Sequence, residues 1–364
     1  MKRIVFAVTN DLSYDQRMHR ICNTLSANGF EVVLVGRKLP KSAALREENY
    51  MQKRINCFFN RKAVFYAEYN IRLFLYILFR KADIYAAVDF DTLPAMTMLS
   101  IFRFKKLIFD AHEYFTEVPE LEGRGVAKFL WKLIGRICLP FVSKAYTVNK
   151  SLSVLLGNKY KKEFFVVRNV PLYSEGKNDS IIKKEFILYQ GAINKGRGLE
   201  ELLYAMQEID LKLVIAGDGD IKMIIRRMID ELKLSHKVEM KGLLPPEALA
   251  DLTKNAFAGY NLLDGSSKSY YYSLSNKFFD YLHAHIPSIS NDFPEYRYIN
   301  GKFEVGVLTE LDRQSIVESV NFLLNDEAYY RKLKDNCMLA AKHYCWQNEE
   351  KILLSIYEQY RKTY

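Results

Sequence analysis

The chain has 364 residues, 49% of them hydrophobic and 26% charged, which suits two α/β domains of ordinary size and excludes a disordered chain, a fibre or a disulfide scaffold. The five cysteines never form a Cys-x-x-Cys pair, so zinc is not expected and a reducing, cytoplasmic compartment is predicted. The longest uncharged apolar run, 73–79, is far shorter than the roughly 20 residues of a membrane span. The first residues predict a strand and not a signal peptide.

The charge is unevenly distributed. Residues 1–170 carry 28 Lys and Arg against 15 Asp and Glu, a net charge of +13, whereas the remainder carries 25 against 28, a net charge of −3. This asymmetry predicts that the first part of the chain faces a polyanion or an anionic membrane surface. No nucleic-acid-binding module is recognisable, so nucleic acid is not the expected partner.

Alternating buried runs and amphipathic stretches predict a parallel α/β domain in the first part of the chain. A strand at 3–8 is followed by a helix over 14–28, which Gly29 should end as the C′ residue, and by a strand at 31–35. Further strands, with apolar helices between them, are expected at 84–88, 106–109, 145–148 and 164–167.

A polar, turn-rich stretch, 171–179, is predicted to be an inter-domain linker. Beyond it we expect strands at 186–190, 212–216, 237–240 and 257–262, helices at 199–209, 221–234, 246–254 and 276–283, and successive helices from 313 onward. The predicted domains are therefore two Rossmann-like units, 1–170 and 171–345, with a last helix (about 346–364) packing back on the first. Such folds bind ligands at the carboxyl ends of their strands.

The turn after the strand at 186–190 is rich in glycine and reads Gln-Gly-Ala-Ile-Asn-Lys-Gly-Arg-Gly-Leu-Glu from residue 190. Glycines such as Gly191 let the backbone approach a ligand, and the following helix offers N–H groups to phosphate. Lys195 and Arg197 add cations at the same place. The turn predicts a phosphate site, and the alternative is a tight turn with solvated basic residues.

A second candidate segment is Ser275-Asn276-Lys277-Phe278-Phe279-Asp280. Ser275 is expected to be the N-cap of a helix, with Lys277 in the first turn and Asp280 on the same face. Lys277 could hold a diphosphate while Asp280 accepts hydrogen bonds from ribose. The alternative is an exposed Lys–Asp pair of little energetic value.

Polar residues also follow a first-domain strand in Asp110-Ala111-His112-Glu113. His112 is predicted to hydrogen-bond a sugar or to assist proton movement, the alternative being a packed structural histidine. Two Asp-x-Asp strings, at 89–91 and 218–220, lack the further ligands of a metal site. Asp91 and Asp220 are instead expected to be helix N-caps.

Residues 124–138 predict an amphipathic helix with Trp131 and a basic edge formed by Arg124, Lys128, Lys132 and Arg136. Such a helix can lie on anionic lipid. It can also be a surface helix whose apolar side (129, 130, 133, 134 and 137) packs on the sheet, and the two interpretations are compatible.

Together these motifs resemble the retaining family-4 glycosyltransferases of the GT-B fold over almost the whole chain. The landmarks occur in the family's order: Tyr14-Asp15-Gln16-Arg17, Asp110-Ala111-His112-Glu113, Arg168-Asn169-Val170-Pro171, Tyr189-Gln190-Gly191, Arg197-Gly198, Ala216-Gly217-Asp218-Gly219, the segment from Ser275 to Tyr281, and Trp346. The resemblance implies two Rossmann-like domains facing each other across a cleft, with C-terminal helices that cross back. It also implies a nucleotide-sugar donor on the second domain and an acceptor on the first.

The resemblance assigns roles to individual residues. Arg197 and Lys277 would bind the donor diphosphate, Asp280 the ribose, and the catalytic-site His112 would lie beside the donor sugar. The other implied positions are Gly191, Lys195, Ser275 and Asn276 for the diphosphate, Lys241, Gly242 and Leu243 for the base, and Asp15, Arg17, Asp91 and Glu113 on the acceptor side. Two positions depart from the pattern: Tyr272 replaces the first Glu of the Glu-x7-Glu motif, and Ala192 stands where many relatives carry a second Arg.

The expected function is that of a hexosyltransferase that needs neither metal nor cofactor. It would move a sugar from a UDP- or GDP-sugar to a lipid-linked or glycan acceptor in cell-surface polysaccharide synthesis, in the cytoplasm and on the inner membrane face. Family members retain the anomeric configuration, with same-face attack and proton transfer to the leaving phosphate. Two alternatives stay open: a GT-B nucleotide-sugar epimerase, and a lapsed transferase that serves as a partner or scaffold. A dehydrogenase is disfavoured because neither domain carries the dinucleotide fingerprint.

Overall fold

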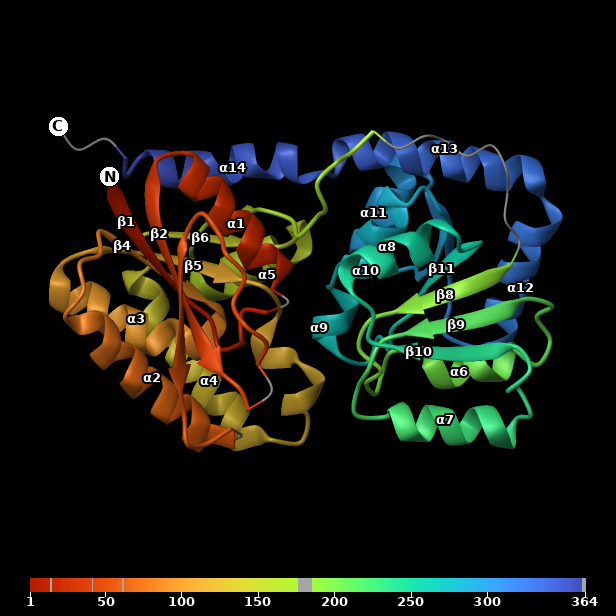
Figure 1. Cartoon of the computed structure of the whole chain (residues 1–364), viewed down its shortest axis with the longest axis horizontal. Coiled ribbons are helices and arrows are strands. Elements are labelled where there is room, and N and C mark those ends of the chain that lie inside the picture. The colour runs from red at the N-terminus through yellow and green to blue at the C-terminus, as the bar shows by residue number, and fades with distance from the viewer. Residues whose placement is uncertain (14, 41, 61, 176–184, 362–364) are drawn as a thin grey trace. The chain divides into compact units, whose positions relative to one another are not determined.

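The computed structural model describes residues 1–13, 15–40, 42–60, 62–175 and 185–361. The chain forms two compact units, one made of Met1–Asn169 with Glu349–Tyr364 and the other of Val170–Asn348. Each unit contains one parallel sheet with helices packed against it (Figure 1). The fold class predicted from the sequence, two Rossmann-like α/β units, is confirmed.

The first unit contains a seven-stranded sheet with the order β3-β2-β1-β4-β5-β6-β7. Its strands are β1 (Lys2–Ala7), β2 (Phe30–Lys38), β3 (Met51–Asn56), β4 (Ile84–Val88), β5 (Lys106–Ala111), β6 (Lys144–Thr147) and β7 (Phe164–Val166). All five residues of β4 are buried, as expected for a parallel strand that is covered on both faces.

Helices cover both faces of this sheet. They are α1 (Gln16–Ala27), α2 (Lys62–Leu78), α3 (Asp89–Arg103), α4 (Gly125–Cys138), α5 (Lys150–Tyr160) and α14 (Trp346–Glu358). Figure 1 shows α1 and α14 on one side of the sheet and α2, α3 and α4 on the other. Tyr357 of α14 packs its ring against Phe6 and Phe30 in the first two strands. Gly29 has a φ of +83°, which confirms the predicted C′ residue of α1.

The second unit contains a six-stranded sheet with the order β10-β9-β8-β11-β12-β13. The strands are β8 (Phe186–Gln190), β9 (Lys212–Ala216), β10 (Val238–Gly242), β11 (Ala258–Asn261), β12 (Ser288–Asn291) and β13 (Gly306–Thr309). The helices are α6 (Leu199–Ala205), α7 (Lys222–Glu231), α8 (Pro246–Lys254), α9 (Lys268–Tyr271), α10 (Asn276–His283), α11 (Pro294–Phe303), α12 (Arg313–Asn325) and α13 (Glu327–His343). An apolar cluster of this unit joins the central strands to α6, α7 and α12.

Several elements match their predicted bounds to the residue, namely β4, β8, β9, α8 and α10. Five strands and helices were missed: β3, α9, α11, β12 and β13. In β3 only Ile55 is buried, and β12 reads Ser-Ile-Ser-Asn, so neither shows the apolar run of a core strand. The helices expected over 199–209 and 221–234 end earlier, at Ala205 and Glu231. Part of the expected linker, 176–179, lies outside the described residues.

The prediction that Asp91 and Asp220 are N-caps is wrong. Helix α3 already begins at Asp89, with Val88 at the N-cap position, so Asp91 lies within the first turn. Helix α7 begins at Lys222 and has Ile221 at its N-cap.

Candidate functional site

The sheet of the second unit has a topological switch point between β8 and β11, because the chain moves outward from β8 in one direction and from β11 in the other. The Gly-rich turn, 191–198, follows β8, and the segment that leads into α10 follows β11. The carboxyl edge beside a switch point is where open α/β sheets bind ligands. Both segments predicted to bind phosphate therefore begin at this edge.

The Gly-rich turn is fixed by close backbone packing against the loop that follows β9. The Gly191 N–H donates to the Ala216 carbonyl at 2.9 Å, and the Ile193 N–H donates to the Asp218 carbonyl at 2.9 Å. A Cβ atom on Gly217 would lie 1.8 Å from the Gly191 carbonyl oxygen, so no other residue fits there. Gly191 itself has a φ of +121°, which side chains rarely adopt.

Lys277, in the first turn of α10, is buried with 8% of its surface exposed. Its Nζ lies 3.9 Å from the ring centroid of Tyr189, near the end of β8. Within the described part of the chain, Nζ has no hydrogen-bond partner. Burial, reinforced by the nearby Arg197, lowers the pKa of Lys277 well below its usual value.

Arg197 brings a second cation to the same place. Its guanidinium lies 4.7 Å from the ring centroid of Tyr270, and its buried Nε has no hydrogen-bond partner among the described residues. A Cβ on Gly191 would lie 4.0 Å from Cε of Lys277, so the glycine turn passes close to the lysine. Buried donors without acceptors are costly. The arrangement of Gly191, Arg197 and Lys277 therefore suits an anionic ligand.

Asp280 lies one turn beyond Lys277 in α10 and is oriented by a side chain from β8. Nε2 of Gln190 donates to Oδ2 of Asp280 at 2.9 Å, and Oγ1 of Thr253 donates to Oε1 of Gln190 at 2.8 Å. A carboxylate fixed in this way, one helical turn beyond Lys277, can accept hydrogen bonds from hydroxyl groups of a ligand. Sequence reasoning missed Gln190 and Thr253, although a polar residue at the end of a buried strand was a usable signal.

The remaining predicted residues of the second unit have more peripheral positions. Ser275 occupies the N-cap position of α10, but its Oγ donates to Oδ1 of Asn261 at 2.6 Å and does not cap the helix. Asn276 is the first residue of α10, and Lys195 is exposed in the glycine turn. Lys241 forms an ion pair with Glu239 at 2.6 Å. Gly242 ends β10, and the side chain of Leu243 beyond it is exposed.

The first unit has its own switch point, between β1 and β4. Thr9, just after β1, donates from Oγ1 to Oδ2 of Asp91 at 2.5 Å. Asp89, directly after β4, has a left-handed φ of +54°, a conformation that Asp tolerates better than most residues. Sequence reasoning did not single out Asp89 as part of a site.

His112 contacts two carboxylates, those of Asp110 and Asp89. Its Nε2 is 2.9 Å from Oδ2 of Asp110, and its backbone N–H donates to Oδ1 of Asp89 at 2.8 Å. Burial alone would lower the pKa of His112, but Asp110 and Asp89 outweigh it and raise the pKa to about 9. At neutral pH the imidazole is therefore charged and can donate a hydrogen bond or stabilise negative charge.

Arg17, predicted on the acceptor side, forms a buried ion pair with Asp110. Nη2 and Nε of Arg17 lie 2.8 and 3.1 Å from the two carboxylate oxygens, and Nη1 donates to the Val167 carbonyl at 2.8 Å. Burial raises the pKa of Asp110, but Arg17 and His112 outweigh it and lower the pKa to about 2. Arg17 therefore fixes Asp110, which in turn holds His112. Asp15 accepts a hydrogen bond from the Met18 N–H and caps α1.

Two other acidic groups of this cluster, Asp91 and Glu113, have raised pKa values, in contrast to Asp110. Burial, with a contribution from Asp89, raises the pKa of Asp91 to about 7. Burial also raises the pKa of Glu113 to about 8, with Asp89 and Glu120 contributing. Of the four positions predicted on the acceptor side, the structure thus places Arg17, Asp91 and Glu113 in or around the His112 cluster.

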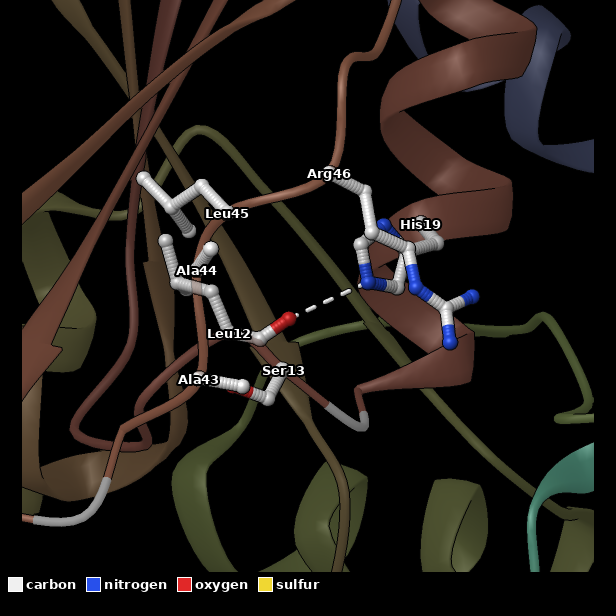
Figure 2. A pocket seen from close by; sticks show the side chains of 7 residues that line it. All are labelled: Leu12, Ser13, His19, Ala43, Ala44, Leu45 and Arg46. Atoms are coloured by element: carbon white, nitrogen blue, oxygen red, sulfur yellow. Dashed lines mark hydrogen bonds between the residues drawn. The ribbon is translucent and has the colours of Figure 1, made fainter.

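Glu113 also lines a large cavity of about 1070 Å³ between α2 and α4. A second cavity, of about 60 Å³, lies beside α1 and is lined by Leu12, Ser13, His19 and residues 43–46 (Figure 2). His19 closes one side of it, with Nε2 3.1 Å from the Leu12 carbonyl oxygen. A space of this size holds only a few water molecules.

The interpretation that the apolar side of α4 packs on the sheet is wrong. Phe129, Leu130, Leu133 and Ile137 are exposed, and the helix packs inward through Gly135 and Cys138. Among its cations, Lys128 and Lys132 reach Glu117 at 2.5 and 3.8 Å, and Arg124 and Arg136 are exposed. Within the described part of the chain, no helix is both long and apolar enough to cross a membrane.

These features define a two-unit α/β protein whose second unit brings Lys277 and Arg197 together near the carboxyl edge of its sheet. Residues 174–339 match the family described as glycosyl transferases group 1. This part of the chain is similar to that family, in agreement with the resemblance to group 1 glycosyltransferases that the sequence predicts.

Two relatives match parts of the chain. One is the N-acetylgalactosamine-N,N'-diacetylbacillosaminyl-diphospho-undecaprenol 4-alpha-N-acetylgalactosaminyltransferase of Campylobacter jejuni, 29% identical over 170 residues, which are 45% of this chain and 44% of that protein. The other is an uncharacterized glycosyltransferase of Methanocaldococcus jannaschii, 34% identical over 77 residues, 20% of each chain. The chain therefore matches less than half the length of either relative.

Solved structures share the fold at low identity. Sucrose-phosphate synthase from Thermosynechococcus elongatus superposes with a TM-score of 0.81 at 15% identity, over 99% of both chains. HepE of Anabaena, in complex with UDP and glucose, gives a TM-score of 0.76 at 11% identity, over 99% of this chain and 100% of that one. A putative UDP-N-acetylglucosamine 2-epimerase from Listeria monocytogenes gives 0.67 at 14% identity, over 100% and 98%. The fold is therefore GT-B.

Proposed function

We propose that the protein is a retaining family-4 glycosyltransferase of hexosyl type. It would move a sugar from a UDP- or GDP-sugar to a lipid-linked or glycan acceptor in the synthesis of a cell-surface polysaccharide. The observation that carries this proposal is the buried Lys277 beside Arg197 and Gly191, at the switch point of the unit that matches the family.

The charge of the donor site fits the leaving group of the reaction. Breaking the anomeric bond of a nucleotide-sugar places negative charge on a diphosphate, and preorganised cations stabilise that charge most strongly in a site that excludes water. Lys277 and Arg197 would supply this stabilisation without a metal ion, with Lys195 as a more exposed third cation. Asp280, held by Gln190, would accept hydrogen bonds from the ribose.

The acceptor hydroxyl would attack from the face that the diphosphate leaves, so that the leaving phosphate takes its proton and the anomeric configuration is retained. No protein base is then required. His112, charged at neutral pH through Asp110 and Asp89, would donate a hydrogen bond to a sugar hydroxyl.

Features of the first unit favour a lipid-linked acceptor over a free glycan. The net charge of +13 over residues 1–170 suits a diphosphate-linked lipid on an anionic bilayer. Helix α4 exposes apolar side chains next to Arg124 and Arg136, as a helix that lies on a membrane does. The substrate in the name of the Campylobacter relative is likewise a diphospho-undecaprenol glycan. We therefore place the protein in the cytoplasm, on the inner membrane face.

A transfer assay tests the proposal. UDP- and GDP-sugars are incubated in EDTA with a panel of polyprenyl-diphosphate glycans, and the new linkage is examined by NMR. The proposal expects a product whose anomeric configuration equals that of the donor. Isomerised nucleotide-sugar formed without any acceptor would favour the epimerase alternative. If the protein shows no turnover and binds no nucleotide, the result would favour the lapsed transferase that Tyr272 and Ala192 suggest.

A further inference from the structure

The cavity of about 1070 Å³ in the first unit has charged residues at one end and apolar residues at the other. Its walls come from α2, α4 and the segment after β5, and Pro94 of α3 forms part of its floor. It is lined by Ala63, Tyr66, Ala67, Asn70, Pro94, Glu113, Phe115, Val118, Glu120, Leu121, Arg124, Ala127, Leu130, Trp131 and Ile134. Most of these side chains are apolar, which is typical of a pocket that buries hydrocarbon.

The charged groups gather at one end. Glu113 and Glu120 belong to the segment after β5, at the carboxyl edge of the sheet, and Arg124 directly precedes α4. The side-chain amide of Asn70 forms hydrogen bonds within the protein: it donates to the Tyr66 and Asp91 carbonyls and accepts from the Ala95 N–H. The polar end of the cavity therefore lies on the same edge as His112.

The apolar end extends away from that edge. Along α4, the lining residues after Arg124 are Ala127, Leu130, Trp131 and Ile134, and only the indole of Trp131 carries a polar group. Trp131 packs edge-on against Tyr66 and Phe115, with ring centroids 5.1 and 5.0 Å apart.

The exposed face of α3 continues the apolar lining beyond the cavity. Met98 and Phe102 follow Pro94 at intervals of four residues and are 58% and 66% exposed. The helix rises about 12 Å over the eight steps from Pro94 to Phe102. Exposed apolar side chains on the helix that contributes Pro94 to the cavity favour a site for hydrocarbon.

We infer that this cavity binds the hydrocarbon chain of an amphiphilic acceptor. The anionic and sugar-bearing head lies at Arg124, Glu113 and Glu120, and the chain runs between α2 and α4 along Pro94 and Met98. Charge and polarity select this occupant: a guanidinium and two carboxyl groups suit a phosphate and sugar hydroxyls, and the apolar end offers a glycan almost no hydrogen bonds. The inference rests on the proposed function for the nature of the acceptor, but it assigns the chain a place in the first unit.

Trp131 allows a direct binding test, because the chain has only two tryptophans. In a Trp346→Phe background, Trp131 fluorescence is titrated with farnesyl diphosphate, inorganic diphosphate and a soluble oligosaccharide. Two substitutions, Ala67→Phe and Ala127→Phe, fill the cavity from opposite walls. Val64→Phe is the matched control, since Val64 is an exposed residue of α2 that does not line the cavity. Circular dichroism checks that each variant is folded.

We expect farnesyl diphosphate to change the Trp131 signal saturably and to bind at least tenfold more tightly than inorganic diphosphate. Each filling variant should weaken farnesyl diphosphate binding by at least tenfold, and Val64→Phe by less than twofold. Equal binding of inorganic diphosphate, a saturable response to the oligosaccharide alone, or unchanged binding in both folded filling variants would overturn the inference. Because the readout needs neither donor nor turnover, it can succeed even if the transferase proposal fails, and the reverse also holds.

Discussion

The ammonium group of Lys277 lies 3.9 Å from the ring centroid of Tyr189, buried and without a hydrogen-bond partner among the described residues. A cation–π contact compensates only part of the cost of burying a charge. The free protein therefore keeps a buried amino group, with a lowered pKa, at the edge where the chain is expected to bind a diphosphate. Substitution of Lys277 should therefore have opposite effects on the stability of the free protein and on its binding of diphosphate.

Replacing Lys277 by Met should raise the melting temperature of the free protein while weakening inorganic diphosphate binding by at least tenfold. The charge is lost, but the length of the side chain is kept. Differential scanning calorimetry and isothermal titration measure the two effects, with Lys195→Met as the control because Lys195 is exposed in the same turn. A variant that is less stable and binds diphosphate normally would contradict the assigned role.

Asp280→Ala should affect nucleotides and not their diphosphate alone. Gln190 fixes the carboxylate that we propose accepts hydrogen bonds from the ribose, so its loss removes those hydrogen bonds. We expect at least tenfold weaker binding of the preferred nucleoside diphosphate and less than a twofold change for inorganic diphosphate. An equal loss for both ligands would mean that Asp280 supports the phosphate site and not the ribose.

Asp110→Asn should be strongly destabilising, because it leaves the Arg17 guanidinium buried without its counter-charge. Removing one partner of a buried ion pair typically costs about 3–5 kcal/mol. Urea unfolding measures the change. The exposed pair of Arg297 and Asp292 gives the comparison: Asp292→Asn should cost no more than about 1 kcal/mol. Similar values for the two variants would contradict the structural role of Asp110.

His112 should make stability depend on pH in the alkaline range. Its pKa is about 9 in the folded protein, above the value of roughly 6.5 in an unfolded chain. The stabilisation from its charge is therefore complete below pH 6.5 and is lost as the pH rises through 9. The difference in unfolding free energy between wild type and His112→Gln should shrink over that range. A constant difference for His112→Gln would contradict the charged imidazole.

Sequence patterns predicted the parts of the fold that depend on local signals. Helix α10 was predicted to the residue, and its i, i+3 spacing already placed Lys277 and Asp280 on one face. What surrounds them could not be read locally, because Tyr189 and Gln190 come from a strand almost ninety residues earlier. The same holds for Arg17 and Asp110, which are 93 residues apart.

Helix α4 shows a second limit of sequence reasoning. Periodicity distinguished its apolar side from its basic side but could not decide which side meets the sheet. The deciding contact involves Gly135, where a Cβ would lie 2.6 Å from the ring of Phe90. The helix thus approaches its neighbours through a small residue and leaves Phe129 and Ile137 exposed.

We propose that the second unit binds a nucleotide-sugar through Lys277 and Arg197. Isothermal titration of UDP, GDP and their common sugar conjugates in EDTA, on wild type and Lys277→Met, tests it most directly. We expect micromolar or tighter binding of one nucleotide series to the wild type and loss of that binding in Lys277→Met. Absence of binding to the wild type, or equal binding to both proteins, would contradict it.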